Sequence, residues 1–174
     1  MTDRFGHQLR LDQIGEGERI DLVADEGECG AICKRLGLEA LDRLEAHAVM
    51  SRTGGKVRAT GRLGASVTQS CVVTGEPIAA HIDEPFELLF VPEQPAAGAD
   101  QDIELGEQDC DVVFYDGAAI DLGSAIADTL ALSLDPYPRS ASAELALKEA
   151  GVLSEEQASP FAVLAALKSR KDED

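Results

Sequence analysis

The chain has 174 residues, of which 28% are charged, and a formal net charge of −18 at pH 7. This length is enough for one domain with a real core, and 44% hydrophobic residues at a mean hydropathy of −0.09 are typical of a soluble globular protein. No run approaches the roughly 18 apolar residues that a membrane-spanning helix needs. The N-terminus has no signal-peptide pattern, so we expect a cytoplasmic protein that does not contact a membrane.

The charge is unevenly distributed along the chain. Residues 63–138 contain fifteen Asp and Glu and no Lys or Arg. This stretch is either a solvated surface that keeps the protein soluble or an acidic face for a basic partner. A surface this negative repels phosphate backbones, which argues against broad, non-specific RNA binding.

The first third of the chain predicts two strands and a helix. HQLRLDQI and GEGERIDLVAD, at 7–25, have the pattern of two short strands around a glycine-rich turn. In EGECGAICKRLGL, at 26–38, four apolar residues share one helical face, and Gly37 is placed to end the helix. The members of that face are Cys29, Ile32, Cys33 and Leu36.

The middle of the chain predicts a three-stranded antiparallel meander over about 40–50, 57–67 and 78–90, with turns at 53–55 and 74–77. Gly61 and Gly64 indicate a bulge or a sharp bend, and Pro85 an edge or a break. The side chains expected to face the core are Leu44, Ala46, Ala48, Met50, Val57, Ala59, Leu63, Ala65, Val67, Ile78, Ala80, Ile82, Phe86, Leu88 and Phe90.

An acidic loop follows at about 93–110, and then a short strand in DVVFYDG. A helix begins after its N-cap Asp121 and ends before DPYPR. The C-terminal segment at about 140–170 predicts a short helix ended by Gly151 and another that begins at Ser159. The fold class we predict is α+β: one domain over residues 1–174, with a curved antiparallel sheet, barrel-like in its curvature, and helices packed on it.

The four cysteines do not form a metal-binding pattern. A structural zinc site needs about four Cys or His ligands in paired short spacings, and position 74, three after Cys71, is Thr. Cys29 and Cys33 are interpreted as helix core. The strand register places Cys71 on the buried face, away from any Lys or Arg, so we interpret it as a small core residue rather than a nucleophile. We therefore expect no metal and no cofactor.

The sequence gives little indication of catalysis or of nucleotide binding. The carboxylates are abundant, but none can be paired across a cleft from the sequence, and phosphate-binding glycine motifs are absent, so we expect no enzyme. One positive cluster exists, which is either a solvated strand face or a contact for RNA or an acidic partner. It consists of Arg52, Lys56, Arg58 and Arg62. Exposed aromatic residues for base stacking do not interleave with it.

Three segments of the sequence together resemble the YceD family, the large ribosomal RNA subunit accumulation proteins. They are VRATGRLGASVTQSCVVTGEPIAAHIDEPFELLF, IDLGSAIADTLALSLDPYPR and SPFAVLAALK. Many similar proteins have a C-x-x-C pair where this chain has Cys71 and Thr74, and further cysteines where it has SASAELALK. In such relatives those pairs look like a zinc site, which this chain cannot complete. The resemblance also covers two motifs without known catalytic role, namely Asp121, Leu122 and Gly123, and Asp135, Pro136, Tyr137, Pro138 and Arg139.

The resemblance implies a part in producing or stabilising large-subunit ribosomal RNA. We expect a non-enzymatic assembly factor whose acidic surface binds a basic large-subunit ribosomal protein. The acids expected to contribute are Asp100, Asp102, Glu104, Glu107 and Asp109. Two alternatives stay open: a module that contacts ribosomal RNA directly through Arg58 and Arg62, and an enzyme with an unrecognised carboxylate pair. The sequence does not indicate the oligomeric state.

Overall fold

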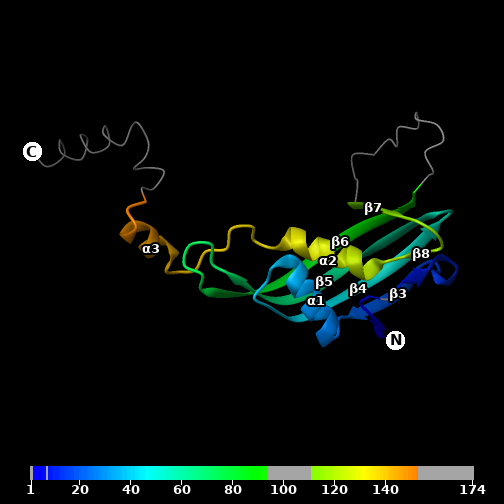
Figure 1. The fold of residues 1–174 in the computed structure, drawn as a ribbon. Helices are drawn as coiled ribbons and strands as arrows, with labels where there is room; N and C mark the ends of the chain where they lie inside the picture. Colours follow the sequence, from blue (N-terminus) through cyan, green and yellow to red (C-terminus); the bar gives the residue numbers. More distant parts are fainter. Residues whose placement is uncertain (1, 7, 94–110, 153–174) are drawn as a thin grey trace, which may run out of the picture. The chain divides into compact units, whose positions relative to one another are not determined.

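The computed structural model describes residues 2–6, 8–93 and 111–152 (Figure 1). The acidic loop, its five named acids and the helix expected from Ser159 lie outside these ranges. The elements are β1 (Thr2–Arg4), β2 (Leu9–Arg10), the 3-10 helix η1 (Leu11–Gln13), β3 (Glu18–Val23), α1 (Glu26–Leu36), β4 (Ala40–Thr53), β5 (Lys56–Ser70), β6 (Pro77–Pro92), β7 (Asp111–Tyr115), β8 (Ala119–Ile120), α2 (Leu122–Ser133) and α3 (Ala143–Glu149).

The described elements fall into two compact units. The sheet unit comprises residues 1–69 and 79–136, and the tip unit comprises 70–78 together with the chain from 137 onward. The sheet unit holds every helix and strand except α3 and the ends of β5 and β6. None of the described helices has the length and apolar character needed to cross a membrane.

The main sheet has six strands in the order β1-β3-β4-β5-β6-β7. The three strands of the predicted meander, β4, β5 and β6, lie next to one another in this order. β4 runs antiparallel to β3 and to β5, whereas the outer pairs β1–β3 and β6–β7 are parallel. The predicted α+β class is confirmed. The sheet ends at β1 and β7 and does not close into a barrel.

The alternation of apolar residues predicts correctly most of the side chains of the long strands that face the core; the exceptions are Ile78 and Ala80 at the start of β6, which are only partly buried. Leu44, Met50, Val57, Ala59, Leu63 and Ala65 have no measurable exposure, and the core also includes Leu88 and Phe90 of β6. Helices α1 and α2 lie against this face (Figure 1), and α2 contributes Leu122, Ile126 and Leu130 to the core. We call the opposite, solvent-facing side of the sheet the open face.

The two predicted N-terminal strands exist but do not pair with each other. β2 pairs with β8 in a separate two-stranded sheet, and β3 pairs with β1 and β4. The backbone N–H of Leu11 donates to the carbonyl of Ala118 at 2.9 Å, so the chain after β2 follows β8 and turns into η1. The sequence pattern identified extended segments but not their partners, because pairing depends on residues more than a hundred positions away.

The ends of α1 follow from local chemistry. Asp25 accepts a hydrogen bond from the N–H of Glu28, and the Glu28 carboxylate accepts one from the N–H of Asp25, which forms a capping box. Gly37 ends the helix in the left-handed conformation at φ 66°, as the sequence predicts.

Gly61 is required by a close approach of strands rather than by a bulge. The pairing of β5 with β4 runs without interruption through Gly61 and Gly64, and its irregularity lies between Leu41 and Arg43. A Cβ atom on Gly61 would lie 1.9 Å from the carbonyl oxygen of His47 and 2.9 Å from the ring of Phe86. Position 61 therefore needs a residue without a side chain because of this close approach.

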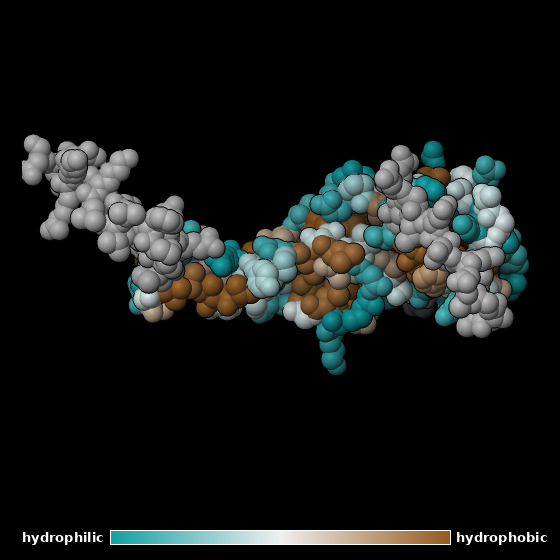
Figure 2. All heavy atoms as spheres, turned by 90° about the horizontal axis from the view of Figure 1, so that it is seen from above, coloured by the Kyte–Doolittle hydropathy of each residue, from teal (hydrophilic) through white to brown (hydrophobic). Residues whose placement is uncertain are grey.

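The surface is less uniformly hydrophilic than a net charge of −18 suggests. Figure 2 shows apolar residues at the surface between hydrophilic ones. Exposed large apolar side chains include Phe114 at 58% and Leu132 at 78% exposure. Phe114 lies on β7, an outer strand of the sheet.

Candidate functional site

The basic cluster predicted on β5 is neutralised by the neighbouring strand. Arg58 forms an ion pair with Glu87, and the Nε atom of Arg62 donates to Oδ1 of Asp83 at 3.0 Å. Both acids lie on β6, so the acidic strand runs beside the basic one along the open face. Arg58 and Arg62 share one face, as the sequence predicts, but neither presents an uncompensated charge.

The other two members of that cluster lie near the β4–β5 hairpin. Arg52 donates to the carbonyl oxygens of Leu11 and Gly54, so its guanidinium holds the turn against η1. Lys56 begins β5 and is exposed. The structure thus assigns Arg52 a structural contact.

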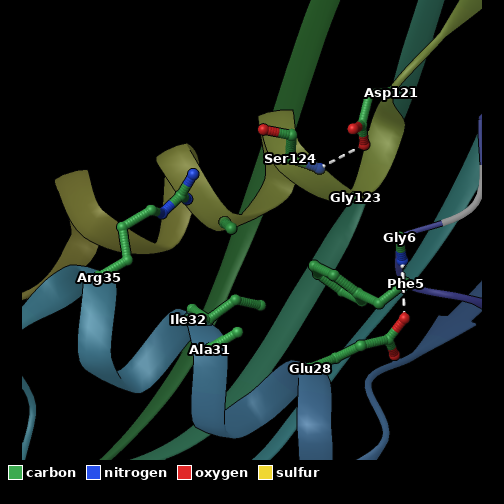
Figure 3. Close-up of a pocket in the computed structure, with 10 residues that line it drawn as sticks. Phe5, Gly6, Glu28, Ala31, Ile32, Arg35, Asp121, Gly123 and Ser124 are labelled. Atoms are coloured by element: carbon green, nitrogen blue, oxygen red, sulfur yellow. Dashed lines mark hydrogen bonds between the residues drawn. The ribbon is translucent and has the colours of Figure 1, made fainter.

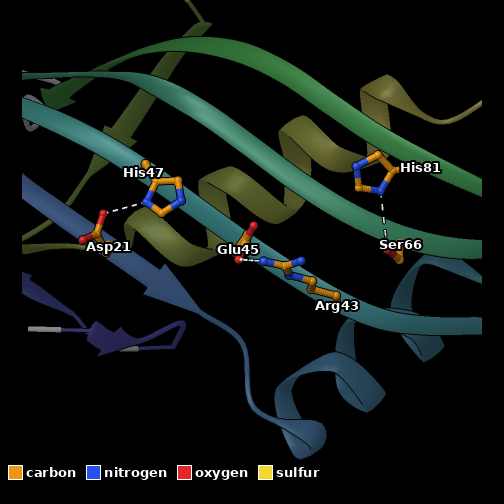
Figure 4. A network of polar contacts seen from close by, with 6 residues as sticks. All are labelled: Asp21, Arg43, Glu45, His47, Ser66 and His81. Carbon is orange, nitrogen blue, oxygen red and sulfur yellow. Dashed lines mark hydrogen bonds and ion pairs between the residues drawn. The ribbon is translucent and has the colours of Figure 1, made fainter.

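The open face continues as a set of paired polar residues (Figure 4). His47 Nδ1 lies 2.6 Å from Oδ1 of Asp21 on β3, and Arg43 donates to Glu45 at 2.6 Å along β4. His47, Asp21 and Arg43 are more than half exposed, and only Glu45 is partly buried. Ion pairs this close to solvent contribute less than about 1 kcal/mol each. Their main effect is to balance charge across this face.

The motif Asp121–Gly123 forms the entry to α2. The Asp121 carboxylate accepts a hydrogen bond from the N–H of Ser124 at 2.8 Å, which confirms the predicted N-cap. A Cβ atom on Gly123 would lie only 1.5 Å from the carbonyl oxygen of Phe5. The glycine therefore lets the N-terminal strand segment lie directly on the first turn of α2 (Figure 3).

A groove of about 250 Å³ lies between α1 and α2 next to this crossing (Figure 3). Its walls are mostly apolar, from Phe5, Ala31, Ile32 and Ala127. The Glu28 carboxylate at its edge accepts hydrogen bonds from the N–H groups of Gly6 and Asp25. Its carboxylates are thus engaged with backbone donors rather than facing each other as a catalytic pair.

Cys71 is buried, as predicted, but its surroundings are polar. Its exposure is 3%, and it lies outside the main core cluster, in the tip unit. The Sγ atom accepts hydrogen bonds from the N–H of Ser140 at 3.2 Å and of Thr74 at 3.4 Å. The interpretation of Cys71 as an ordinary apolar core residue is therefore incomplete.

These contacts change the acidity of the thiol. Burial alone would raise the pKa of Cys71, but hydrogen bonds from the side chains and backbone of Ser140 and Thr74 outweigh it and lower the pKa to about 6. Cys71 therefore has the character of a thiolate at neutral pH.

A second acid completes what we call the Cys71 cluster, namely Cys71, Thr74, Glu76, Ser140 and Ser142. Glu76 accepts hydrogen bonds from the hydroxyls of Ser142 and Thr74, the latter at 3.1 Å, and hydrogen bonds to serine and threonine hydroxyls lower its pKa. Ser140 Oγ lies 3.0 Å from Ser142 Oγ and 3.2 Å from Thr74 Oγ1. Donors from two distant segments thus converge on a thiol and a carboxylate.

The DPYPR motif brings those two segments together. The carbonyl of Pro138 accepts a hydrogen bond from the N–H of Val72 at 2.9 Å, and two residues later Ser140 contacts Cys71. Upstream, in the sheet unit, the carbonyl of Asp135 accepts from the side chain of Gln69 at 2.9 Å. The motif therefore makes structural contacts through the backbone carbonyls of Asp135 and Pro138.

We expect the protein to fold without zinc. Cys71 accepts hydrogen bonds from its neighbours, and within the described ranges no three His, Cys, Asp or Glu side chains are placed to share a metal ion. Elemental analysis of the purified protein should find far less than one zinc per chain, and a chelator should leave the circular dichroism spectrum unchanged. About one zinc per chain, removed by chelation with loss of structure, would contradict this expectation.

A comparison with protein families gives one match. The model described as "Large ribosomal RNA subunit accumulation protein YceD" matches residues 59–168, which is more than half of the chain. No curated protein and no solved structure matches it. The matched range begins in β5 and includes the Cys71 cluster, Asp121–Gly123 and the DPYPR motif.

Proposed function

Because the chain belongs to the YceD family of large ribosomal RNA subunit accumulation proteins, we propose that it is a non-enzymatic, cytoplasmic assembly factor. In this role it binds a basic protein of the large ribosomal subunit on its acidic surface and so supports accumulation of the subunit's RNA. The observation that carries the proposal is the stretch 63–138, with fifteen acids and no Lys or Arg, inside the chain's match to the family.

The distribution of ion pairs supports a basic protein as partner. Arg58 and Arg62 are each compensated by a carboxylate of β6. Among the described residues, no cation pairs with Asp111 or Asp116, at the two ends of β7. Uncompensated negative charge raises the local concentration of a cationic protein and speeds its association.

Direct RNA binding through β5 is the weaker alternative. A phosphate group that approached Arg58 or Arg62 would have to displace Glu87 or Asp83, and would meet the repulsion of both carboxylates. An enzymatic role is also less supported, since the carboxylates beside the groove of Figure 3, Glu28 and Asp121, accept hydrogen bonds from backbone N–H groups.

Binding kinetics with purified basic large-subunit ribosomal proteins test the proposal. We expect fast association that weakens as salt shortens the Debye length from about 10 Å at 0.1 M to about 3 Å at 1 M. Neutralising the loop acids together should slow association and flatten its salt dependence without unfolding the protein. The variant is Asp100→Asn, Asp102→Asn, Glu104→Gln, Glu107→Gln and Asp109→Asn.

A control variant removes the same charge from dispersed, exposed positions. It carries Glu16→Gln, Asp42→Asn, Glu84→Gln, Glu144→Gln and Glu149→Gln. If the loop binds the partner, the control should retain most of the association rate, and only the loop variant should fail to restore large-subunit RNA in cells that lack the protein. Absence of binding to any basic ribosomal protein at low salt would refute the proposal.

A further inference from the structure

β7 is an outer strand of the main sheet. In the part of the chain that the structure describes, it pairs with β6 alone, in parallel register from Leu88↔Asp111 to Pro92↔Tyr115. An outer strand presents a row of backbone N–H and C=O groups to whatever lies beside it. β7 is short, but it has the composition of an interior strand, DVVFY.

The hydrogen bond at the end of β7 shows which of its backbone groups point outward. The carbonyl of Tyr115 accepts from the N–H of Glu93, so Tyr115 turns its backbone toward β6. Successive residues of a strand turn their backbone groups to opposite edges. Val112 and Phe114 therefore direct their N–H and C=O groups away from β6, toward the free edge.

The open face beside this edge is apolar. Register places Leu89 next to Val112, and Val91 next to Phe114. Leu88 and Phe90 belong to the core cluster, so strand alternation directs their neighbours Leu89 and Val91 to the other side of the sheet, where Leu89 is half-buried and Val91 is buried. Phe114 is 58% exposed. An apolar side chain added beside Phe114 would cover it.

The opposite side of the same edge is acidic. A groove of about 300 Å³ between β7 and α2 is lined by three carboxylates, Asp116, Asp121 and Asp128, and by no Lys or Arg. Its apolar lining includes Val113, Phe114 and Tyr115, so Phe114 borders this groove as well as the open face. Asp128 forms an ion pair with Arg35 at 3.0 Å, and Asp121 caps the N-terminus of α2. Among the described residues, no cation forms an ion pair with Asp116.

We propose that the outer edge of β7, with which no described strand pairs, binds an extended segment of a basic partner protein as an added strand. Basic and apolar residues alternate in this segment. The basic side chains would enter the acidic groove beside α2, and the apolar ones would pack on Phe114 on the open face. Main-chain hydrogen bonds to Val112 and Phe114 fix the register. This inference rests on the proposed function for the identity of the partner, but its geometry does not depend on it.

A second copy of this chain fits the edge poorly. Pairing β7 with its own copy would bring Asp111 and Asp116 of one molecule near those of the other, and like charges across a strand pair are destabilising. A nucleic acid fits poorly as well, because three carboxylates and no Lys or Arg line the groove that its phosphates would approach. Charge thus selects a cationic polypeptide.

Fluorescence anisotropy with two synthetic peptides tests the inference on the full-length protein. In one peptide lysine alternates with valine, and in the other the same residues are grouped into a lysine block and a valine block. We expect the alternating peptide to bind at least about tenfold more tightly. Hydrogen exchange should show the amides of Val112 and Phe114 protected on binding, and that of Val113 unchanged.

Proline variants separate strand addition from electrostatic attraction. Val112→Pro and Phe114→Pro each remove an outward N–H without touching the ladder to β6, a position where outer strands tolerate proline. Each should weaken the alternating peptide about tenfold, whereas Val112→Ala should not. Asp116→Asn should weaken binding mainly at low salt. Thermal unfolding verifies that each variant is folded.

Equal binding of the two peptides would overturn the inference. The same conclusion would follow if neither proline variant weakened binding and no amide became protected. The proposed function would then depend on non-specific electrostatic attraction alone. Self-association that the proline variants abolish, without peptide binding, would also overturn it in favour of a second copy. Edge-dependent peptide binding by a protein that binds no ribosomal protein would support the inference and refute the proposed function.

Discussion

Replacing Gly123 with alanine should destabilise the protein by about 2–4 kcal/mol, an unusually large effect for a single methyl group. The added Cβ would lie 1.5 Å from the carbonyl oxygen of Phe5 and 2.6 Å from its carbonyl carbon. Both are backbone atoms, so no rotamer change can relieve the clash. Residues 5–6 or the first turn of α2 must move.

The loss of stability can be estimated from the contacts that are broken when residues 5–6 move. Phe5 is 2% exposed, and full burial of a phenylalanine contributes about 1.5–3 kcal/mol. Moving residues 5–6 also breaks the hydrogen bond from the N–H of Gly6 to Glu28, at 2.9 Å, worth about 1 kcal/mol. The groove between α1 and α2 would lose one wall at the same time (Figure 3).

Gly30→Ala is the matched control. Gly30 also lies inside a helix, but a Cβ there meets nothing within 4 Å. The change should stabilise the protein by about 0.5–1 kcal/mol, because alanine favours the helix and restricts the unfolded chain. Urea unfolding of both variants measures the difference. Equal stability of the two variants would show that the N-terminal crossing does not depend on glycine.

The contact of Gly123 with Phe5 is an example of a feature that sequence patterns do not reveal, because its two partners are far apart in the chain. Periodicity identified α2, its N-cap and its buried face, because these depend on neighbours within one or two turns. Nothing local indicates that Phe5 crosses the helix at Gly123, since the two residues are more than a hundred positions apart. The same holds for β2, whose partner β8 is equally distant.

The ion pairs of Arg58 and Arg62 also could not be predicted from the sequence pattern, because they too depend on contacts between strands. The alternation of β5 predicted correctly that Arg58 and Arg62 share an exposed face. Their compensation by Glu87 and Asp83 depends on the register between β5 and β6, which the turn alone did not fix. A cluster that appears basic along one strand is therefore close to neutral across two.

One feature of the resemblance predicts that the segments around Thr74 and Ser140 meet next to Cys71. The resemblance to the YceD family implies, for many relatives, cysteines at position 74 and in the segment after DPYPR, and a shared zinc site would require these two segments to meet. In this chain the same segments meet around Cys71 through Thr74 and Ser140. The sequence predicts that this chain lacks the zinc site of such relatives at Cys71 and Thr74. The structure has a polar cluster there, with hydroxyl and N–H donors.

That cluster should make Cys71 titrate with a pKa of about 6, against an ordinary value of 9.0. At pH 6 about half of the thiol would then be ionised, whereas an ordinary cysteine would be ionised in about one molecule in a thousand. The pH dependence of thiolate ultraviolet absorbance, taken as the difference between wild type and Cys71→Ala, measures the midpoint.

Two serine variants identify the cause. Ser140→Ala removes a hydroxyl that stabilises the thiolate and should raise the pKa of Cys71 toward its ordinary value. Ser142→Ala removes a hydroxyl that bonds Glu76 and Ser140, and should move the Cys71 midpoint much less. Equal midpoints in both variants and the wild type would show that these hydrogen bonds do not control the thiol.

The sign of the effect on stability follows from the direction of the shift. A thiol whose pKa is lowered in the folded protein stabilises the fold fully above its unfolded value of 9.0, and this contribution is lost as the pH falls through about 6. Wild type should therefore lose more stability than Cys71→Ala between pH 9 and pH 6, as measured by urea unfolding. Parallel curves for the two proteins over that range would mean that Cys71 is an ordinary buried thiol, which is what its sequence neighbourhood alone suggests.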